Sequence, residues 1–294
     1  MEIKGIITAM VTPFNEDDSI NKEATSQLIE KLISEGASGI FILGTNGEFH
    51  VMSEDEKVNF ASLVVRFVNH RVPVYAGAGN CGTKQSIILG NKLKEVGVDA
   101  LSIITPYLQK LSEYELIEHY KLIASSVDLP ILLYNIPSNT QNPITKEAVR
   151  QLCKIPNIKG IKDSSGNIEV MKEYIQVSKN EEFVVLSGSD SLILKALQLG
   201  ASGAVAATSN LLCKIDVSIY DFFINQEIEK ASKAQESIEE LRKVLKLGVQ
   251  PSVLKRSLEF IGIPVGKTRS PISATSQSID NEIKKMLSYY RLGG

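Results

Sequence analysis

The chain has 294 residues, of which 43% are hydrophobic and 22% charged, as is usual for a globular protein with a large core. Its 32 Lys and Arg residues against 34 Asp and Glu residues give a formal charge of -2. This balance, and the lack of a basic run interleaved with aromatic residues, argue against disorder and against nucleic acid as a partner.

Short β-rich runs recur along the chain, and each ends in residues that favour a turn. Their starts lie 20 to 34 residues apart, which leaves room for a helix between consecutive runs. We expect eight strands: Gly5–Val11, Gly39–Leu43, Pro73–Ala76, Ala100–Thr105, Pro130–Asn135, Ile158–Asp163, Phe183–Ser187 and Gly203–Ala207.

The intervening segments show the apolar spacing of amphipathic helices, as at Ala24, Leu28 and Leu32. Ser53–Glu56 and Ser112–Glu115 have the pattern of a capping box, in which a serine and the glutamate three residues later bind the first free backbone N–H groups. We therefore expect helices to begin at both sites. Three helices are expected to end near a glycine, at Gly36, Gly97 and Gly200.

Continuous apolar runs such as Ile40–Leu43 predict strands that are buried on both faces, which is typical of a parallel sheet. Eight strand–helix units fit a closed (β/α)8 TIM barrel, and the alternative is an open, doubly wound sheet. Only helices are expected after the eighth run, most clearly at Pro251–Ile261 and Ser278–Tyr290. We predict a barrel core through strand 8 at residues 1–210, with the last barrel helix and a C-terminal helical extension packed on the barrel at 211–294.

Composition also bears on location and metal binding. No apolar run reaches the roughly 18 residues of a membrane span, and no signal-peptide core is present, so we expect a cytoplasmic protein that does not enter a membrane. The odd number and wide spacing of Cys81, Cys153 and Cys213 favour reduced thiols. The three histidines lack the spacing of a zinc site, and we expect no metal.

A TIM barrel carries its active site at the C-terminal ends of its strands. Lys162 lies near such an end, and Lys159, three residues earlier on the same strand, must point to the opposite face. Burial among apolar strands would lower the pKa of the Lys162 ammonium and free a neutral amine to attack a carbonyl. The alternative is a strand-end lysine that reaches solvent.

Other polar residues follow neighbouring strands. Tyr134 ends the fifth strand, where its phenol is either a proton relay or part of the core. The turn Gly44–Glu48 offers backbone N–H groups and the Thr45 hydroxyl as a nest for a carboxylate, although glycine-rich turns end many strands. Asp190 is either the N-cap of a helix at Ser191–Leu199 or a ligand for substrate hydroxyls.

The order of five motifs closely resembles the dihydrodipicolinate synthase/N-acetylneuraminate lyase family, with the likeness spanning almost the whole chain. The 28-residue interval from Tyr134 to Lys162 also matches that family. The resemblance implies a (β/α)8 barrel with a C-terminal helical extension, usually a homotetramer and otherwise a dimer, with neither metal nor organic cofactor. The motifs are Gly44–Glu48, Thr105–Tyr107, Tyr134–Pro137, Gly160–Asp163 and Ser187–Asp190.

The resemblance also assigns roles to residues. Lys162 would form an imine with pyruvate, Tyr134 would relay protons, and Thr45 would join them in catalysis. The pyruvate carboxylate would bind the amides of Thr45 and Asn46. The backbone around Gly188 and Val205 would complete this site, and Tyr107 would contact substrate.

Some positions depart from the synthase pattern. Synthases typically have two tyrosines after the fourth strand, the second of which reaches a neighbouring subunit's site, whereas this chain reads Tyr107-Leu108. They also carry an arginine for the aspartate semialdehyde carboxylate where this chain has Asn139, and a neutral amide cannot replace a guanidinium. Asn46 replaces a second threonine, and sialic acid lyases have an acidic pair where only Asp190 is present.

These departures favour an aldolase that cleaves a 2-keto-3-deoxy sugar acid, such as 2-keto-3-deoxygluconate, into pyruvate and an aldehyde. Asp190, Asn139 and Ser209 would then hydrogen-bond the hydroxylated chain, and dehydratase chemistry is a close relative of this activity. One alternative is dihydrodipicolinate synthase itself, which condenses pyruvate with L-aspartate semialdehyde. Another is a catalytically idle barrel that senses a keto acid or serves as a scaffold.

Overall fold

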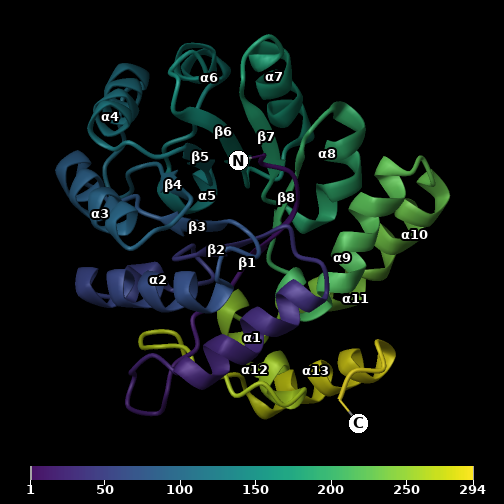
Figure 1. Cartoon of the computed structure of the whole chain (residues 1–294). Helices are drawn as coiled ribbons and strands as arrows, with labels where there is room; N and C mark the ends of the chain where they lie inside the picture. The colour runs from purple at the N-terminus through teal and green to yellow at the C-terminus, as the bar shows by residue number, and fades with distance from the viewer. Residues whose placement is uncertain (1, 294) are drawn as a thin grey trace.

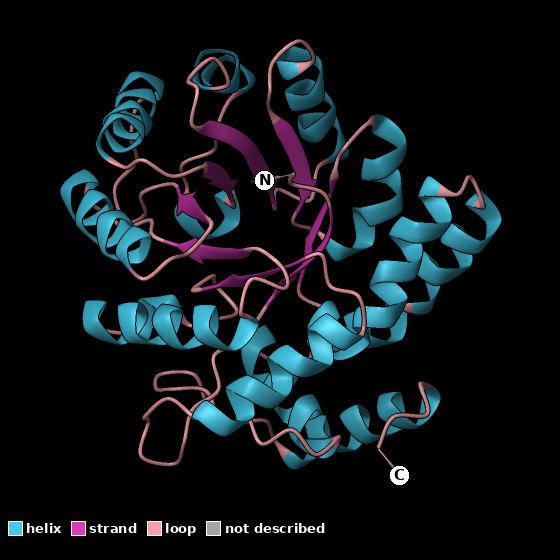
Figure 2. Cartoon of the chain, viewed as in Figure 1, coloured by secondary structure: helices cyan, strands magenta, loops and turns pink. Residues whose placement is uncertain are grey.

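The computed structural model describes residues 2–293 and contains a closed barrel of eight parallel strands in chain order, with β8 paired to β1. Figure 2 shows the strands at the centre with helices around them. The predicted TIM barrel is confirmed and the open-sheet alternative is wrong. The strands are β1 (Gly5–Ala9), β2 (Gly39–Ile42), β3 (Val74–Gly77), β4 (Ala100–Ile104), β5 (Ile131–Asn135), β6 (Ile158–Asp163), β7 (Val184–Ser187) and β8 (Gly203–Ala206).

Helices follow each strand and continue past the barrel (Figure 1). Those up to β8 are α1 (Lys22–Ser34), α2 (Glu54–Val68), α3 (Thr83–Glu95), α4 (Glu113–Ser126), α5 (Pro137–Thr140), α6 (Lys146–Leu152), α7 (Ile168–Ser178) and α8 (Ile193–Leu199), with short 3-10 turns η1 (Phe49–Val51) and η2 (Asp190–Leu192). After β8 come α9 (Ser209–Ile224), α10 (Ile228–Ser237), α11 (Glu239–Leu245), α12 (Gln250–Phe260) and α13 (Gln277–Tyr289).

Local sequence signals set several helix ends. Both predicted capping boxes are confirmed: Ser53 and Ser112 accept backbone N–H groups at the starts of α2 and α4, and the glutamates three residues later bind back. Gly36, Gly97 and Gly200 follow α1, α3 and α8 with φ of 94°, 90° and 104°, a left-handed conformation that glycine adopts without a Cβ clash.

Two layers of side chains form the core. One cluster, which includes Ile7, Phe41, Leu132 and Leu186, comes almost entirely from the strands and fills the inside of the barrel. The second lies between the outer face of the strands and the surrounding helices. The barrel is therefore a packed core whose interior is open to ligands only near its ends.

In Figure 1 helices α9, α10 and α11 lie on the right of the barrel, and α12 and α13 lie in the lower part of the picture. Helix α12 of the C-terminal extension packs against α9, α11 and α13. Helix α9 begins at Ser209, so the predicted boundary at residue 210 falls just inside this helix. The two predicted C-terminal helices are present with each end shifted by one residue. Within residues 2–293, no helix has the length and apolar character needed to cross a membrane.

Candidate active site

Lys162 lies at the C-terminal end of the barrel with only 5% of its surface exposed. Its Nζ is 4.1 Å from the ring centroid of Tyr134 and 4.7 Å from that of Phe41. Lys159, on the opposite face of the same strand, instead pairs with Glu182 at 2.8 Å. The amine of Lys162 therefore projects into the barrel among aromatic faces, and the alternative of a lysine that reaches solvent is wrong.

Strand register brings Tyr134 beside Lys162. The two residues are direct partners across β5 and β6, so their side chains leave the sheet at the same level. The Tyr134 hydroxyl lies 3.3 Å from Oγ1 of Thr45, which follows β2 on the far side of the barrel mouth. A hydroxyl pair next to an amine can pass protons to and from a carbon bound to that amine.

The turn after β2 presents free donors toward the same space. Within residues 2–293, no hydrogen bond engages the backbone N–H of Thr45 or Asn46. The turn is bounded by Leu43 and Glu48, both with positive φ, at 56° and 57°. Such conformations are costly outside glycine and persist only where surrounding contacts hold them. The geometry suits an anion that accepts both N–H groups and the Thr45 hydroxyl.

Those surrounding contacts come from the C-terminal extension. Glu48 is fully buried and accepts hydrogen bonds from the ammonium of Lys255 on α12 and from the backbone N–H of Arg269, each at 2.9 Å. Lys255 also donates to the carbonyl of Lys267 at 2.8 Å and lies over the ring of Phe14. This four-residue contact, Glu48 with Lys255, Arg269 and Phe14, is called the Glu48 clamp below. It fixes one end of the anion-binding turn.

Gly188, after β7, leaves space for the Lys162 side chain. A Cβ at this position would lie 3.0 Å from Cε of Lys162 and 2.1 Å from Oγ of Ser164. The glycine is therefore required by close approach and not by its backbone angles. Any larger residue would push on the side chain that carries the amine.

Asp190 is not the helix N-cap, which was one alternative for it, and its contact with substrate hydroxyls stays a prediction. Its carboxylate accepts the N–H groups of Ala207 and Thr208, at 3.0 and 3.3 Å, and so holds the turn after β8. It makes no N-cap hydrogen bond, because the 3-10 turn η2 starts at Asp190 and α8 begins only at Ile193. Burial raises the pKa of its carboxyl, while the two amides, Arg242 and Lys162 oppose that shift.

These side chains surround a cavity of about 580 Å³ at the C-terminal end of the barrel. Strand ends and their loops supply most of its wall, as expected for this fold. Eight of the predicted site residues line it: Thr45, Asn46, Tyr134, Asn139, Lys162, Gly188, Asp190 and Val205. The structure thus brings together residues that lie up to 160 positions apart in the chain.

Two predicted site residues lie outside this lining. Tyr107 packs edge-on against Phe49 with ring centroids 6.3 Å apart, and burial, assisted by Cys81, raises the pKa of its phenol to about 12. Ser209 is fully buried and donates to the carbonyl of Ala206 at 2.8 Å. The contact of Tyr107 and Ser209 with substrate therefore stays a prediction.

Several residues that line the cavity belong to no sequence motif. Arg242 belongs to α11, Lys246 directly follows that helix, Gln250 begins α12, and Ser138 belongs to α5. The first three lie in the C-terminal extension, whose packing position follows from no local pattern.

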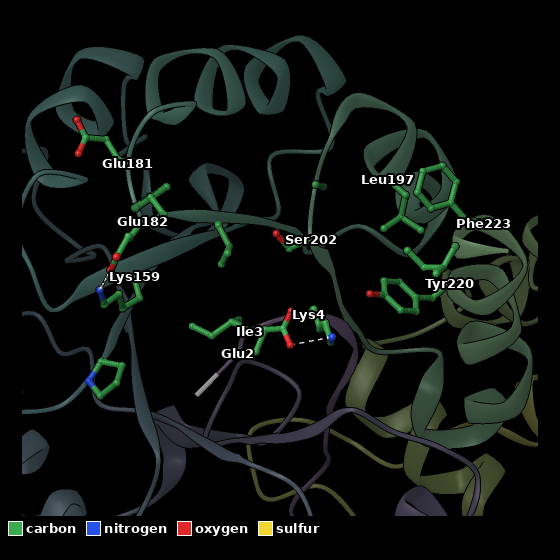
Figure 3. A pocket seen from close by; sticks show the side chains of 15 residues that line it. Glu2, Ile3, Lys4, Lys159, Glu181, Glu182, Leu197, Ser202, Tyr220 and Phe223 are labelled. Carbon is green, nitrogen blue, oxygen red and sulfur yellow. Dashed lines mark hydrogen bonds and ion pairs between the residues drawn. The ribbon is translucent and has the colours of Figure 1, made fainter. Parts of the chain in front are cut away.

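A second cavity, of about 630 Å³, opens at the other end of the barrel (Figure 3). Residues at the beginnings of β1, β6 and β7 line it, together with Tyr220 and Phe223 of α9. Two ion pairs, Glu2–Lys4 and Lys159–Glu182, form part of its wall. Because TIM-barrel active sites lie at the C-terminal ends of strands, this larger cavity is not the candidate active site.

The described residues contain no group of three or more His, Cys, Asp or Glu side chains placed to hold a metal ion. The cavity next to Lys162 also lacks a glycine-rich loop for a nucleotide cofactor. That the protein needs neither metal nor organic cofactor stays a prediction.

Comparison with known proteins gives consistent results. The model of the dihydrodipicolinate synthetase family matches residues 2–290. The chain is 39% identical, over 92% of both chains, to 4-hydroxy-tetrahydrodipicolinate synthase 1 of Halalkalibacterium halodurans. Seven further relatives, 33–35% identical over 92% or more of this chain, have the same activity in their names.

Solved structures of the same family also resemble this chain. Dihydrodipicolinate synthase DapA-2 of Bacillus anthracis superposes with a TM-score of 0.95 at 34% identity, covering 98% of both chains. YagE, a prophage protein of Escherichia coli K12 that belongs to the dihydrodipicolinic acid synthase family and was solved in complex with pyruvate, also superposes at 0.95. It is 29% identical and covers 99% of this chain and 100% of its own.

Proposed function

The chain belongs to the dihydrodipicolinate synthetase family of pyruvate-dependent class I aldolases, and we propose that it condenses pyruvate with L-aspartate semialdehyde through an imine on Lys162. One observation carries the proposal. The Lys162 amine, the Tyr134–Thr45 hydroxyl pair and two free backbone N–H groups converge on one cavity. An amine, a proton relay and a carboxylate nest are what capture of a 2-keto acid requires.

The steps follow from these positions. The pyruvate carboxylate binds the N–H groups of Thr45 and Asn46, and the Lys162 amine attacks the keto carbon. The oxygen of that carbon receives one proton from the attacking amine and a second relayed by Tyr134, and it leaves as water, which gives a protonated imine. This imine withdraws electron density, so the methyl carbon loses a proton and becomes an enamine.

The enamine carbon then attacks the aldehyde carbon of the second substrate. One carbon–carbon bond forms, and the aldehyde oxygen takes up a proton. The amine of the condensed semialdehyde can displace Lys162 from the imine carbon, which closes a ring and returns the free lysine. All atoms of both substrates are retained in the product except the one water that was lost.

The relatives do not support the sugar-acid aldolase that the sequence departures favoured. That preference depended on Leu108 and Asn139, whereas relatives that match 92% or more of the chain have the synthase activity in their names. Cleavage of a 2-keto-3-deoxy acid is the second candidate function, because Asn139 lines the cavity without a charge. Comparing turnover of L-aspartate semialdehyde and 2-keto-3-deoxygluconate separates the two, and faster cleavage of the sugar acid would reverse the order.

Imine formation is tested by borohydride reduction in the presence of pyruvate, followed by peptide mass spectrometry. We expect a pyruvyl adduct on Lys162 in the wild-type chain and none in Lys162→Arg. Lys159→Arg is the matched control, since it lies on the same strand facing away from the cavity and should be labelled as the wild type is. An adduct on another lysine, or no adduct, contradicts the mechanism and leaves the idle keto-acid sensor.

The homotetramer, with a dimer as alternative, and the cytoplasmic location both stay predictions. Leu108 is one feature relevant to assembly, because it is 81% exposed and has a φ of 79°. An exposed apolar side chain on a strained backbone suits contact with a second subunit.

A further inference from the structure

The cavity next to Lys162 has a second charged region. Besides Lys162, the cations that line it are Arg242 of α11 and Lys246, which directly follows that helix. They enter from the C-terminal extension, whereas the carboxylate nest at Thr45 and Asn46 comes from the barrel. A bound molecule can therefore meet donors from two different parts of the fold.

Arg242 and Lys246 are placed on one face of the chain, four residues apart. Arg242 pairs with Glu239 through Nη1 at 2.5 Å, and within residues 2–293 its Nε and Nη2 make no hydrogen bond. Lys246 is exposed and takes part in no ion pair in that part of the chain. Most of their donor capacity is therefore free.

A purely structural explanation is that cations favour the C-terminal end of a helix. Lys243, on the same helix, interacts equally well with the helix dipole. It pairs with Glu240 at 2.5 Å and does not line the cavity. The helix end thus has one cation turned to solvent and two cations turned to the cavity, which the helix dipole alone does not explain.

We propose that Arg242 and Lys246 form a subsite for an anionic group, a carboxylate or a phosphate, on the aldehyde that condenses with pyruvate. This inference rests on the proposed function. The subsite supplies a positive charge that the neutral Asn139 of α5 does not provide. Arginine and lysine are the side chains that bind such oxyanions.

The negative groups nearby leave this subsite available. Asp190 also lines the cavity, but its two carboxylate oxygens are directed to the amides of Ala207 and Thr208. Glu239 engages one nitrogen of Arg242 and none of Lys246. An incoming anion therefore competes with Glu239 for Arg242 only, and removing both cations should have a larger effect than removing either.

The test compares aldehydes that differ in charge. Succinic semialdehyde is paired with butanal, and glyceraldehyde 3-phosphate with glyceraldehyde, so that the two arms separate a carboxylate from a phosphate. In R242Q/K246Q we expect the KM for at least one anionic aldehyde to rise roughly tenfold, as for the loss of a hydrogen bond to a charged group. The KM for its neutral partner and for pyruvate should stay unchanged.

Lys243→Gln is the matched control, because it removes a cation from the same helix without touching the cavity. Equal effects on charged and neutral aldehydes, or an unchanged KM for L-aspartate semialdehyde in R242Q/K246Q, would overturn the subsite. Borohydride labelling of Lys162 by pyruvate distinguishes the two failures. Labelling that persists in R242Q/K246Q without discrimination between aldehydes refutes the subsite alone, whereas absent labelling in the wild type refutes the proposed function.

Discussion

Lys162 and Tyr134 owe their contact to the register of two parallel strands. Because β5 and β6 pair Tyr134 with Lys162 directly, the phenol ring lies against the side chain that carries the amine. Thr45 then reaches the phenol from across the barrel. The three side chains form a path along which a proton can travel between the cavity and the reacting carbon.

Tyr134→Phe tests this path. We expect kcat to fall about 100-fold, because proton transfer by a positioned side chain contributes at least that much. Steady-state kinetics with pyruvate and an accepted aldehyde measure the loss. Phe keeps the ring against Lys162, so the fold and thermal unfolding should not change.

Tyr120→Phe is the control for removal of a buried phenol. Tyr120 is fully buried and donates to the carbonyl of Ile103, away from the cavity. Loss of the Tyr120 hydroxyl should lower the stability of the fold and leave kcat nearly unchanged. If the two variants lost kcat equally, Tyr134 would have no special part in proton transfer.

At the scale of elements, the Glu48 clamp links the turn after β2 to α12 and the segment that follows it. Lys255→Met removes the partner of a buried carboxylate, which costs about 3–5 kcal/mol of stability in typical cases. Glu48→Gln/Lys255→Met removes both charges and should fold better than the single variant. Its pyruvate KM should nevertheless be raised severalfold, because the turn is no longer fixed by an ion pair.

Kinetics of the double variant decide whether the clamp positions the site. Arg256→Met serves as control, since Arg256 ties α12 to Asp280 of α13 at 2.7 Å and does not touch the turn. A wild-type pyruvate KM in the double variant, with stability lowered as in the control, would mean that the clamp only stabilises the fold.

The start of α2 is linked to the same segment by a second carboxylate. The Arg269 side chain, and then the backbone N–H of Ser53, lower the pKa of Glu56 from 4.5 to about 2. A carboxylate with a depressed pKa stabilises the folded state fully above pH 4.5, and this contribution is lost as the pH falls toward 2.

Urea unfolding of the wild type and of Glu56→Gln across this pH range tests whether the contribution of Glu56 to stability falls in acid. The difference in midpoint should be largest above pH 4.5 and should close as the pH approaches 2. Glu118→Gln, on an exposed pair with Lys121 within α4, should show little difference at any pH. A gap that widens in acid would contradict the assignment.

At the scale of the whole molecule, features with a local or periodic origin were predictable. The eight strands repeat with turn residues at their ends, and only a closed barrel lets each strand pair twice. Lys162 and Tyr134 were identified because they fall at strand ends, where the fold builds its site. The hydrogen bonds of Asp190 to the turn after β8 were not predicted, because no pattern in the neighbouring residues indicates them.

Contacts of the C-terminal extension also could not be predicted from the sequence. Glu48 and Lys255 are separated by 207 residues, and neither has a sequence pattern that names the other. The same holds for Arg242 and Lys246, which look like ordinary solvated cations until α11 is placed over the cavity. The preference for a sugar acid was drawn from Leu108 and Asn139 alone, and the relatives, which have the synthase activity in their names, do not support it.

The Glu48 clamp also has a consequence for synthesis on the ribosome. A chain that has emerged as far as β8 contains every barrel strand together with Lys162, yet it lacks both Lys255 and Arg269. Glu48, which bounds the turn after β2, would then have neither of its partners. We therefore expect this turn to reach its final conformation only after α12 and the segment that follows it have joined the fold.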